Sequence, residues 1–164
     1  MPDEEGRPTS RVRAAIGLVL AALLAVMVAV VSVNVLCRYC LRRPSAWAFE
    51  VAQTALVWLC FLGAALGVAE GDHFAVDFLT KKLSPRPARI VWGFVVAAVA
   101  VFAALMAIYG AMLLPTIYGQ RMPATGLSRA WQYAAVPVSG ALMLGFLAAR
   151  LLRRRRGQAR RQGE

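Results

Sequence analysis

Long apolar stretches alternate with short polar and basic segments along this chain. Four of the stretches, at about residues 14–36, 47–68, 90–114 and 131–152, contain almost no charged side chains. A helix needs roughly 20 apolar residues to cross a hydrocarbon core of about 30 Å, and each stretch is long enough. The pattern therefore predicts an all-α membrane protein with four transmembrane helices, which form one membrane domain over residues 14–152.

A fifth segment, residues 73–83, is too short and too charged to cross a bilayer. Asp77, Thr80 and Lys81 fall on one side of a helix drawn from this segment, and Asp72 stands where an N-cap is expected. We predict an amphipathic helix that lies in the membrane interface between the second and third spans. Its apolar arc consists of Phe74, Val76, Phe78, Leu79 and Leu83.

The basic residues predict the orientation of the spans. The formal net charge is +11, but Lys and Arg gather in short clusters between the apolar stretches. Such clusters are typical of loops at an anionic membrane surface and do not indicate nucleic-acid binding. With both termini cytoplasmic, fourteen of the nineteen basic residues lie on the cytoplasmic side, which favours an N-in, C-in arrangement. Residues 1–13 then form a disordered cytoplasmic tail, and residues 153–164 form a basic one.

Glu50 lies about one turn inside the second span, where an ionised carboxylate is costly unless it has a partner. Gln53 and Thr54 share its helical face, so we expect this polar stripe to point at protein rather than lipid. One interpretation is an ion or proton site. We favour a structural contact with Arg38, Arg42 or a partner subunit, because Glu50 stands near the end of the span and not at its centre.

His73 and Asp77 are spaced at i and i+4, so they would share a helical face on which a metal could bind. The chain supplies no second histidine or neighbouring cysteine to complete such a site. A simpler explanation is that Asp72 caps the helix and Asp77 faces solvent. We also find no nucleophile elbow and no phosphate-binding loop, so we expect no metal, no cofactor and no enzymatic activity.

Cys37 and Cys40 form a C-x-x-C motif at the outer end of the first span, and Cys60 lies within the second span. An odd number of cysteines excludes a disulfide scaffold. The motif is similar to the outer cysteines of DsbB-like thiol oxidases, which pass electrons to quinone, so a redox role is one alternative. Those proteins use a second pair in the other outer loop, and residues 116–130 contain no cysteine.

Four short motifs follow one another in the chain. They are Asn34-Val35-Leu36-Cys37-Arg38-Tyr39, then Trp47 with Glu50, then Gly71-Asp72-His73-Phe74-Ala75-Val76-Asp77, and finally Gly119-Gln120-Arg121-Met122-Pro123-Ala124-Thr125-Gly126-Leu127 with Trp131, Tyr133 and Pro137. Their order and joint spacing resemble the small permease subunit of tripartite ATP-independent periplasmic (TRAP) transporters, the DctQ-like family. The resemblance extends over about residues 20–152.

The resemblance implies a complex in the bacterial inner membrane that contains this subunit, a large permease and a periplasmic solute-binding protein. In that family the large permease holds the substrate and ion sites, and the small subunit braces it among the membrane lipids. The solute is expected to be small and organic-acid-like. The arginines of the two outer loops are expected to dock the binding protein or to hold Glu50. They are Arg38, Arg42, Arg43, Arg121 and Arg129. The candidates for subunit-interface or structural polar contacts are Arg38, Glu50, Gln53, His73, Asp77 and Arg121.

A stand-alone exporter is a further alternative. Small four-span multidrug exporters work as dimers and carry a glutamate deep in their first span, whereas residues 14–36 contain no acid. The chain is also longer than that family requires. Within the TRAP resemblance, Cys37 and Cys40 replace residues that are usually apolar, so we expect them to act as small apolar side chains without redox duty.

Overall fold

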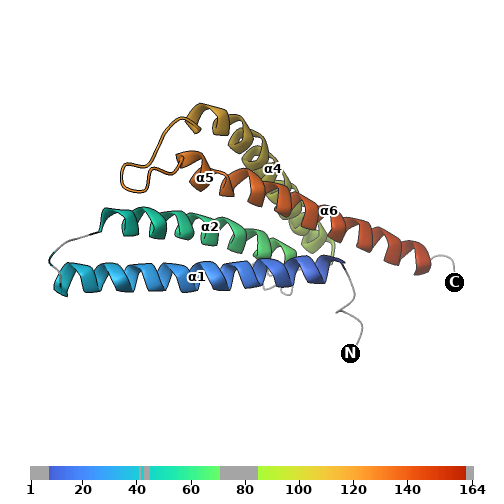
Figure 1. Ribbon diagram of the computed structural model, residues 1–164. Coiled ribbons are helices and arrows are strands. Elements are labelled where there is room, and N and C mark those ends of the chain that lie inside the picture. The colour runs from blue at the N-terminus through green and yellow to red at the C-terminus, as the bar shows by residue number, and fades with distance from the viewer. Residues whose placement is uncertain (1–7, 41, 43–44, 71–84, 162–164) are drawn as a thin grey trace.

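The computed structural model describes residues 8–40, 42, 45–70 and 85–161 of the chain. Over these ranges the regular secondary structure is helical, with a loop over residues 118–128 that contains an isolated β-bridge between Arg121 and Ser128. The helices are α1 (Pro8–Cys40), α2 (Ala46–Glu70), α4 (Pro85–Ile117), α5 (Arg129–Tyr133) and α6 (Ala135–Arg161), as Figure 1 shows.

Four helical segments are long and apolar enough to cross a membrane. They are Arg11–Cys40, Ala46–Glu70, Ile90–Ile117 and Arg129–Leu152, so the prediction of an all-α protein with four spans is confirmed. The beginning of α1 and the end of α6 lie at the same end of the structure, and the connections α1–α2 and α4–α5 lie at the opposite end (Figure 1). The predicted interfacial helix, with Asp72, His73 and Asp77, lies outside the described residues.

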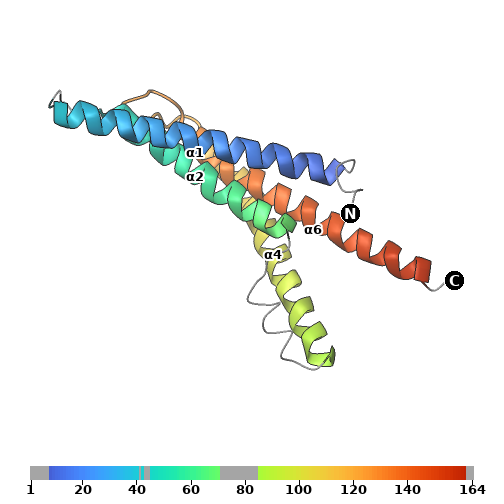
Figure 2. The same ribbon diagram turned by 90° about the horizontal axis from the view of Figure 1, so that it is seen from below.

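The helices pack as two pairs that meet through α2 and α6. Helices α1 and α2 lie side by side, α4 packs on α6, and α2 contacts α6 between the pairs (Figures 1 and 2). Away from this centre the first half of α4 diverges from the other helices (Figure 2). Two apolar clusters hold the pairs together, one made by Ile16, Leu62 and Phe146 and the other by Ala65, Ala103 and Met143.

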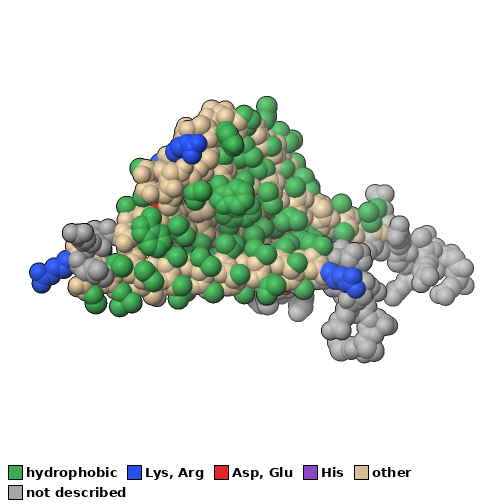
Figure 3. Space-filling model, viewed as in Figure 1, with side chains coloured by type: hydrophobic (Ala, Val, Ile, Leu, Met, Phe, Trp, Pro, Cys, Tyr) green, Lys and Arg blue, Asp and Glu red, His purple; other side chains and the backbone are tan. Residues whose placement is uncertain are grey.

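Large hydrophobic side chains cover much of the surface between the ends of the helices (Figure 3). They include Leu18, Phe94 and Met112, each of which is roughly 70% exposed. Exposed apolar surface of this extent is unfavourable in water and suits a protein that is surrounded by lipid or by other membrane subunits.

Helices α4 and α6 approach so closely that glycine is required at two points. A Cβ added to Gly140 would lie 2.8 Å from the carbonyl oxygen of Ala103 and 2.8 Å from the amide nitrogen of Ala107. A Cβ added to Gly110 would lie 2.8 Å from Cδ of Pro137. Small residues at a helix crossing let the two backbones touch, which increases van der Waals contact. Ala103, which lies at this crossing, is accordingly fully buried.

The third span was predicted over about residues 90–114, and the segment that is long and apolar enough to cross a membrane is Ile90–Ile117, so the helix passes Pro115 instead of stopping before it. Helix α4 begins at Pro85 and continues to Ile117. Pro85 and Pro87 stand in the first turn, where backbone N–H groups have no helical partner, so proline removes nothing there. Pro115 stands in the last turn, where it removes at most one helical hydrogen bond before the helix ends.

The first span was predicted to end at residue 36 and to be followed by a turn, whereas α1 continues to Cys40. The C-x-x-C motif therefore occupies the end of a helix. The turn itself contains Arg42, which has a left-handed backbone with φ of 52°. Helix α1 also begins at Pro8, so residues 8–13 of the predicted disordered tail are helical, and residues 1–7 lie outside the described residues.

The fourth span was predicted to be one helix, but it is interrupted at Ala134, between α5 and α6. Pro137 explains the break, because proline has no N–H to donate and its ring conflicts with the carbonyl of residue i−4, which is Tyr133. The amide of Ala134 still donates to the carbonyl of Ala130 at 2.8 Å, which closes the end of α5.

Candidate functional site

The loop between α4 and α5, residues 118–128, is folded on itself by its own backbone. The amide of Met122 donates to the carbonyl of Leu127 at 2.8 Å, and the amide of Gly126 donates to the carbonyl of Met122 at 2.9 Å. Gly126 has φ of +70°, a left-handed conformation that glycine adopts without strain. The hydroxyl of Ser128 donates to the carbonyl of Tyr118 at 2.7 Å and caps α5. The loop is therefore a compact structure that can present its amides in a fixed direction.

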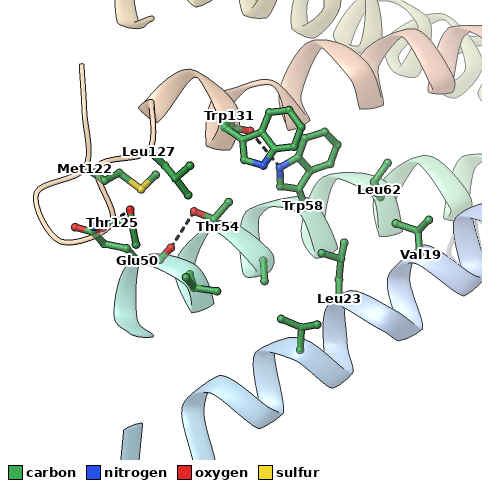
Figure 4. Close-up of a pocket in the computed structure, with 13 residues that line it drawn as sticks. Val19, Leu23, Glu50, Thr54, Trp58, Leu62, Met122, Thr125, Leu127 and Trp131 are labelled. Atoms are coloured by element: carbon green, nitrogen blue, oxygen red, sulfur yellow. Dashed lines mark hydrogen bonds between the residues drawn. The ribbon is translucent and has the colours of Figure 1, made fainter. Parts of the chain in front are cut away.

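The carboxylate of Glu50 accepts hydrogen bonds from backbone amides of this loop. The donors are the backbone N–H of Ala124 at 2.9 Å, the backbone N–H of Thr125 at 2.8 Å and the hydroxyl of Thr125 at 2.7 Å. The side chains of Glu50 and Thr125 are shown in Figure 4. Arg129 adds electrostatic attraction. Glu50 also stands in the first turns of α2, where the helix dipole favours negative charge. Hydrogen bonds to a carboxylate are stronger than those between neutral groups.

This arrangement corrects the predicted partner of Glu50. A structural role was favoured, but with Arg38 or Arg42 or a partner subunit, and the donors belong instead to the α4–α5 loop of the same chain. The pairing is separated by more than 70 residues in sequence, so local spacing gave no direct sign of it. The turn-forming sequence Pro123-Ala124-Thr125-Gly126 was the available signal, because such turns expose successive backbone amides.

The polar stripe predicted on α2 is only partly correct. The hydroxyl of Thr54 donates to the carbonyl of Glu50 at 2.9 Å, a bond within the helix. Gln53 is exposed on the surface of α2 and forms no hydrogen bond with any residue that the structure describes, so the described part of the chain supplies no partner for it.

The two candidate arginines have different surroundings. Arg121 donates from Nη1 to the carbonyl of Gly126 at 3.1 Å, so it supports the loop that binds Glu50. Arg38 lies in the last turn of α1 and is exposed. His73 and Asp77 lie outside the described residues.

An apolar cavity of about 360 Å³ lies directly beneath the Glu50 contact, between α1, α2 and the loop. Glu50, Thr54 and Thr125 form its polar end, and apolar side chains line the rest (Figure 4). The apolar lining is made by Val19, Leu23, Val26, Val51, Ala55, Trp58, Leu62, Met122, Leu127 and Trp131.

Two tryptophans close one side of this cavity, and sequence analysis did not pair them. The indole N–H of Trp58 donates to the carbonyl of Trp131 at 3.2 Å, and the ring centroids are 6.3 Å apart at an angle of 48°. Helix α5 ends at Tyr133, so the carbonyl of Trp131 lies in its last turn, where carbonyls lack a helical donor. Trp58 supplies that donor from α2, and it provides a second link between α2 and the start of the fourth span.

Chemically, the site is a tether and not a reaction centre. Both oxygens of the Glu50 carboxylate are engaged by donors of this chain, and the wall beside them is apolar. The three thiols are free: Cys37 is half-buried, and Cys40 and Cys60 are exposed. The geometry thus connects α2 to the loop that enters the fourth span, and it does so at the end of the structure opposite the beginning of α1 and the end of α6 (Figure 1).

Comparison with known proteins identifies the family. The family described as tripartite ATP-independent periplasmic transporters, DctQ component, matches residues 27–157. The chain belongs to this family. It is 26% identical over 132 residues to the sialic acid TRAP transporter small permease protein SiaQ of Vibrio cholerae serotype O1, covering 77% of this chain and 73% of that protein. It is 31% identical over 118 residues to a putative TRAP transporter small permease protein of Haemophilus influenzae, covering 71% and 70%.

A third relative is much longer. The sialic acid TRAP transporter permease protein SiaT of Haemophilus influenzae is 27% identical over 131 residues, which cover 78% of this chain but only 20% of SiaT. A segment similar to this chain is therefore joined to a far larger membrane protein in SiaT. Because the family is a transporter component and not an enzyme, the thiol-oxidase alternative is wrong, and the stand-alone exporter loses its support.

Proposed function

We propose that this chain is the small membrane subunit of a TRAP-type transporter and that it braces a large permease during ion-gradient-driven uptake. The solute is a small organic acid or similar molecule that a periplasmic binding protein delivers. The family match over residues 27–157 carries this proposal. The names of its relatives, SiaQ and SiaT, are those of a small permease and a permease of sialic acid TRAP transporters, and sialic acid is itself an organic acid.

The geometry supports bracing more than transport. A transport site needs polar groups that are available to substrate or ion, whereas the carboxylate of Glu50 already accepts three hydrogen bonds from its own chain. Those bonds and the Trp58–Trp131 contact hold α2 against the start of the fourth span. The subunit is thus reinforced at one end, and broad exposed apolar surfaces are left for lipid and for a partner.

For the orientation we propose both termini in the cytoplasm, with the predicted interfacial helix at the cytoplasmic surface. The excess of Lys and Arg in the segments at that end supports this arrangement. Cys40 is exposed at the opposite end of α1 and offers a test. A membrane-impermeant maleimide added to spheroplasts should label Cys40 from outside. Labelling only after the membrane is opened would contradict the orientation.

The subunit role itself is tested by purification from the native membrane. The chain, tagged at its C-terminus, should bring down a large multi-span permease in stoichiometric amount after extraction in mild detergent. Recovery of the tagged chain alone, from membranes in which the permease gene is expressed, would overturn the proposal.

A further inference from the structure

Helix α2 has one strip of its surface that faces away from the other helices that the structure describes. We call this strip the open α2 face. At 100° per residue its members fall within an arc of about 100°, opposite the buried residues Ala48, Ala55 and Leu62. Phe49 is 68% exposed and Leu56 is 48% exposed. The open α2 face consists of Phe49, Gln53, Leu56, Cys60, Gly63, Ala64 and Gly67.

Gln53 makes this strip unsuitable for lipid alone. It follows Trp47 by six residues, so it lies about 9 Å further along the helix from the indole that marks the interface. Its primary amide carries two donors and an acceptor, and lipid tails satisfy none of them. Gln53 forms no hydrogen bond with any residue that the structure describes. A polar group at this depth indicates a neighbouring protein helix that can hydrogen-bond to it.

The second half of the strip is shaped for close approach. A Cβ added to Gly63 or Gly67 would meet no atom within 4 Å, so these glycines do not serve packing within the described part of the chain. Cys60 and Ala64, which lie beside them, are small and exposed. Glycine and alanine at such spacing form a shallow groove into which another helix can pack. A close-packing role for Gly63 and Gly67 therefore requires a partner helix.

From these observations we infer that the open α2 face is the surface on which a transmembrane helix of the large permease docks, with a polar side chain of that helix bonded to Gln53. The inference rests on the proposed function, because that function supplies the partner. SiaT supports the choice of partner, since its segment similar to this chain is covalently part of the larger permease. The open α2 face is opposite the side of α2 that packs on α6, so docking leaves the Glu50 contact and the cavity undisturbed.

Two leucine substitutions test the surface. Gly63→Leu places a bulky side chain in the groove at a position where an added Cβ meets no described atom within 4 Å, and Gly93→Leu is a matched control on α4, where an added Cβ also meets nothing within 4 Å. We expect Gly63→Leu to lower the recovery of permease per tagged subunit by about tenfold or more, because a bulky side chain separates the two helices. Gly93→Leu should change it little. Normal recovery with Gly63→Leu, or equal loss with both variants, would overturn the inference.

Cys60 gives a readout that does not depend on a substitution in the groove. In a chain with Cys37→Ala and Cys40→Ala, Cys60 is the one cysteine left, and it lies on the open α2 face. N-ethylmaleimide in mild detergent should modify Cys60 about tenfold more slowly in the complex than in the isolated subunit, because a docked helix covers the sulfur. Equal rates in an intact complex would show that the surface is wrong while the subunit role stands. Failure to form any complex would instead remove the proposed function.

Discussion

The carboxylate of Glu50 and Thr125 are joined by two hydrogen bonds, from the backbone N–H at 2.8 Å and from the hydroxyl at 2.7 Å. They connect the first turns of α2 to the middle of the loop that leads into the fourth span. Because these bonds fix the middle of the loop to α2, the order of the loop should depend on this acid.

Removing the hydroxyl of Thr125 should loosen the loop. Thr125→Val keeps the shape of the side chain but deletes one of three donors to Glu50, whereas Thr125→Ser keeps that donor. Hydrogen exchange measured by mass spectrometry over residues 118–128 should be severalfold faster in the valine variant and nearly unchanged in the serine variant. The same exchange rate in both variants would show that the hydroxyl does not hold the loop.

Neutralising Glu50 should act through the same loop. In Glu50→Gln one carboxylate oxygen is replaced by an NH₂ group, which faces N–H donors and cannot accept from them. We expect faster exchange over residues 118–128, with solute uptake reduced only as far as the complex is destabilised. If uptake were abolished while the loop exchanged at its normal rate, Glu50 would be an ion or proton site and the tether interpretation would be contradicted.

A methyl group at Gly140 should destabilise the α4–α6 crossing. In Gly140→Ala the new Cβ would lie 2.8 Å from backbone atoms of Ala103 and Ala107, so the helices must separate. The expected cost is about 1–3 kcal/mol, typical of overpacking. Gly145→Ala is the control, because its added Cβ meets nothing within 4 Å and alanine favours the helix. Thermal unfolding in detergent should show a lower midpoint for Gly140→Ala only.

The hydrogen bond from Trp58 to the carbonyl of Trp131 can be removed while the aromatic contact is retained. Trp58→Phe should lower stability by about 0.5–1.5 kcal/mol, the usual net value of one such bond. Trp47→Phe, at an exposed position near the start of α2, serves as the control and should be close to neutral. Equal melting temperatures for Trp58→Phe and the unchanged protein would show that the bond contributes nothing.

The cysteines at the end of α1 should be dispensable. Replacing Cys37 and Cys40 together by alanine removes two free thiols from the last turn of the helix, and alanine is compatible with that helix. Uptake by the assembled transporter should be unchanged. A large loss of uptake with normal complex assembly would point to redox chemistry that the family assignment does not include.

Sequence alone was sufficient for the number of spans, because apolar length near 20 residues is a strong local signal. It also identified Glu50 and favoured a structural role for it. It was insufficient for the partner of Glu50, since a contact between α2 and residues 124–125 depends on how two distant segments fold together. The effect of two prolines on the helix bounds also differed from the prediction. Pro115 lies inside α4, beyond the predicted end of the third span, whereas the fourth span is interrupted near Ala134, three residues before Pro137.

Bracing is tested most directly by purifying the large permease with and without this chain. If the subunit braces the permease, the permease alone should still bind its substrate but should melt at a lower temperature and support little uptake in proteoliposomes. Adding this chain should restore both stability and uptake. A permease that melts and transports equally well in its absence would contradict the account.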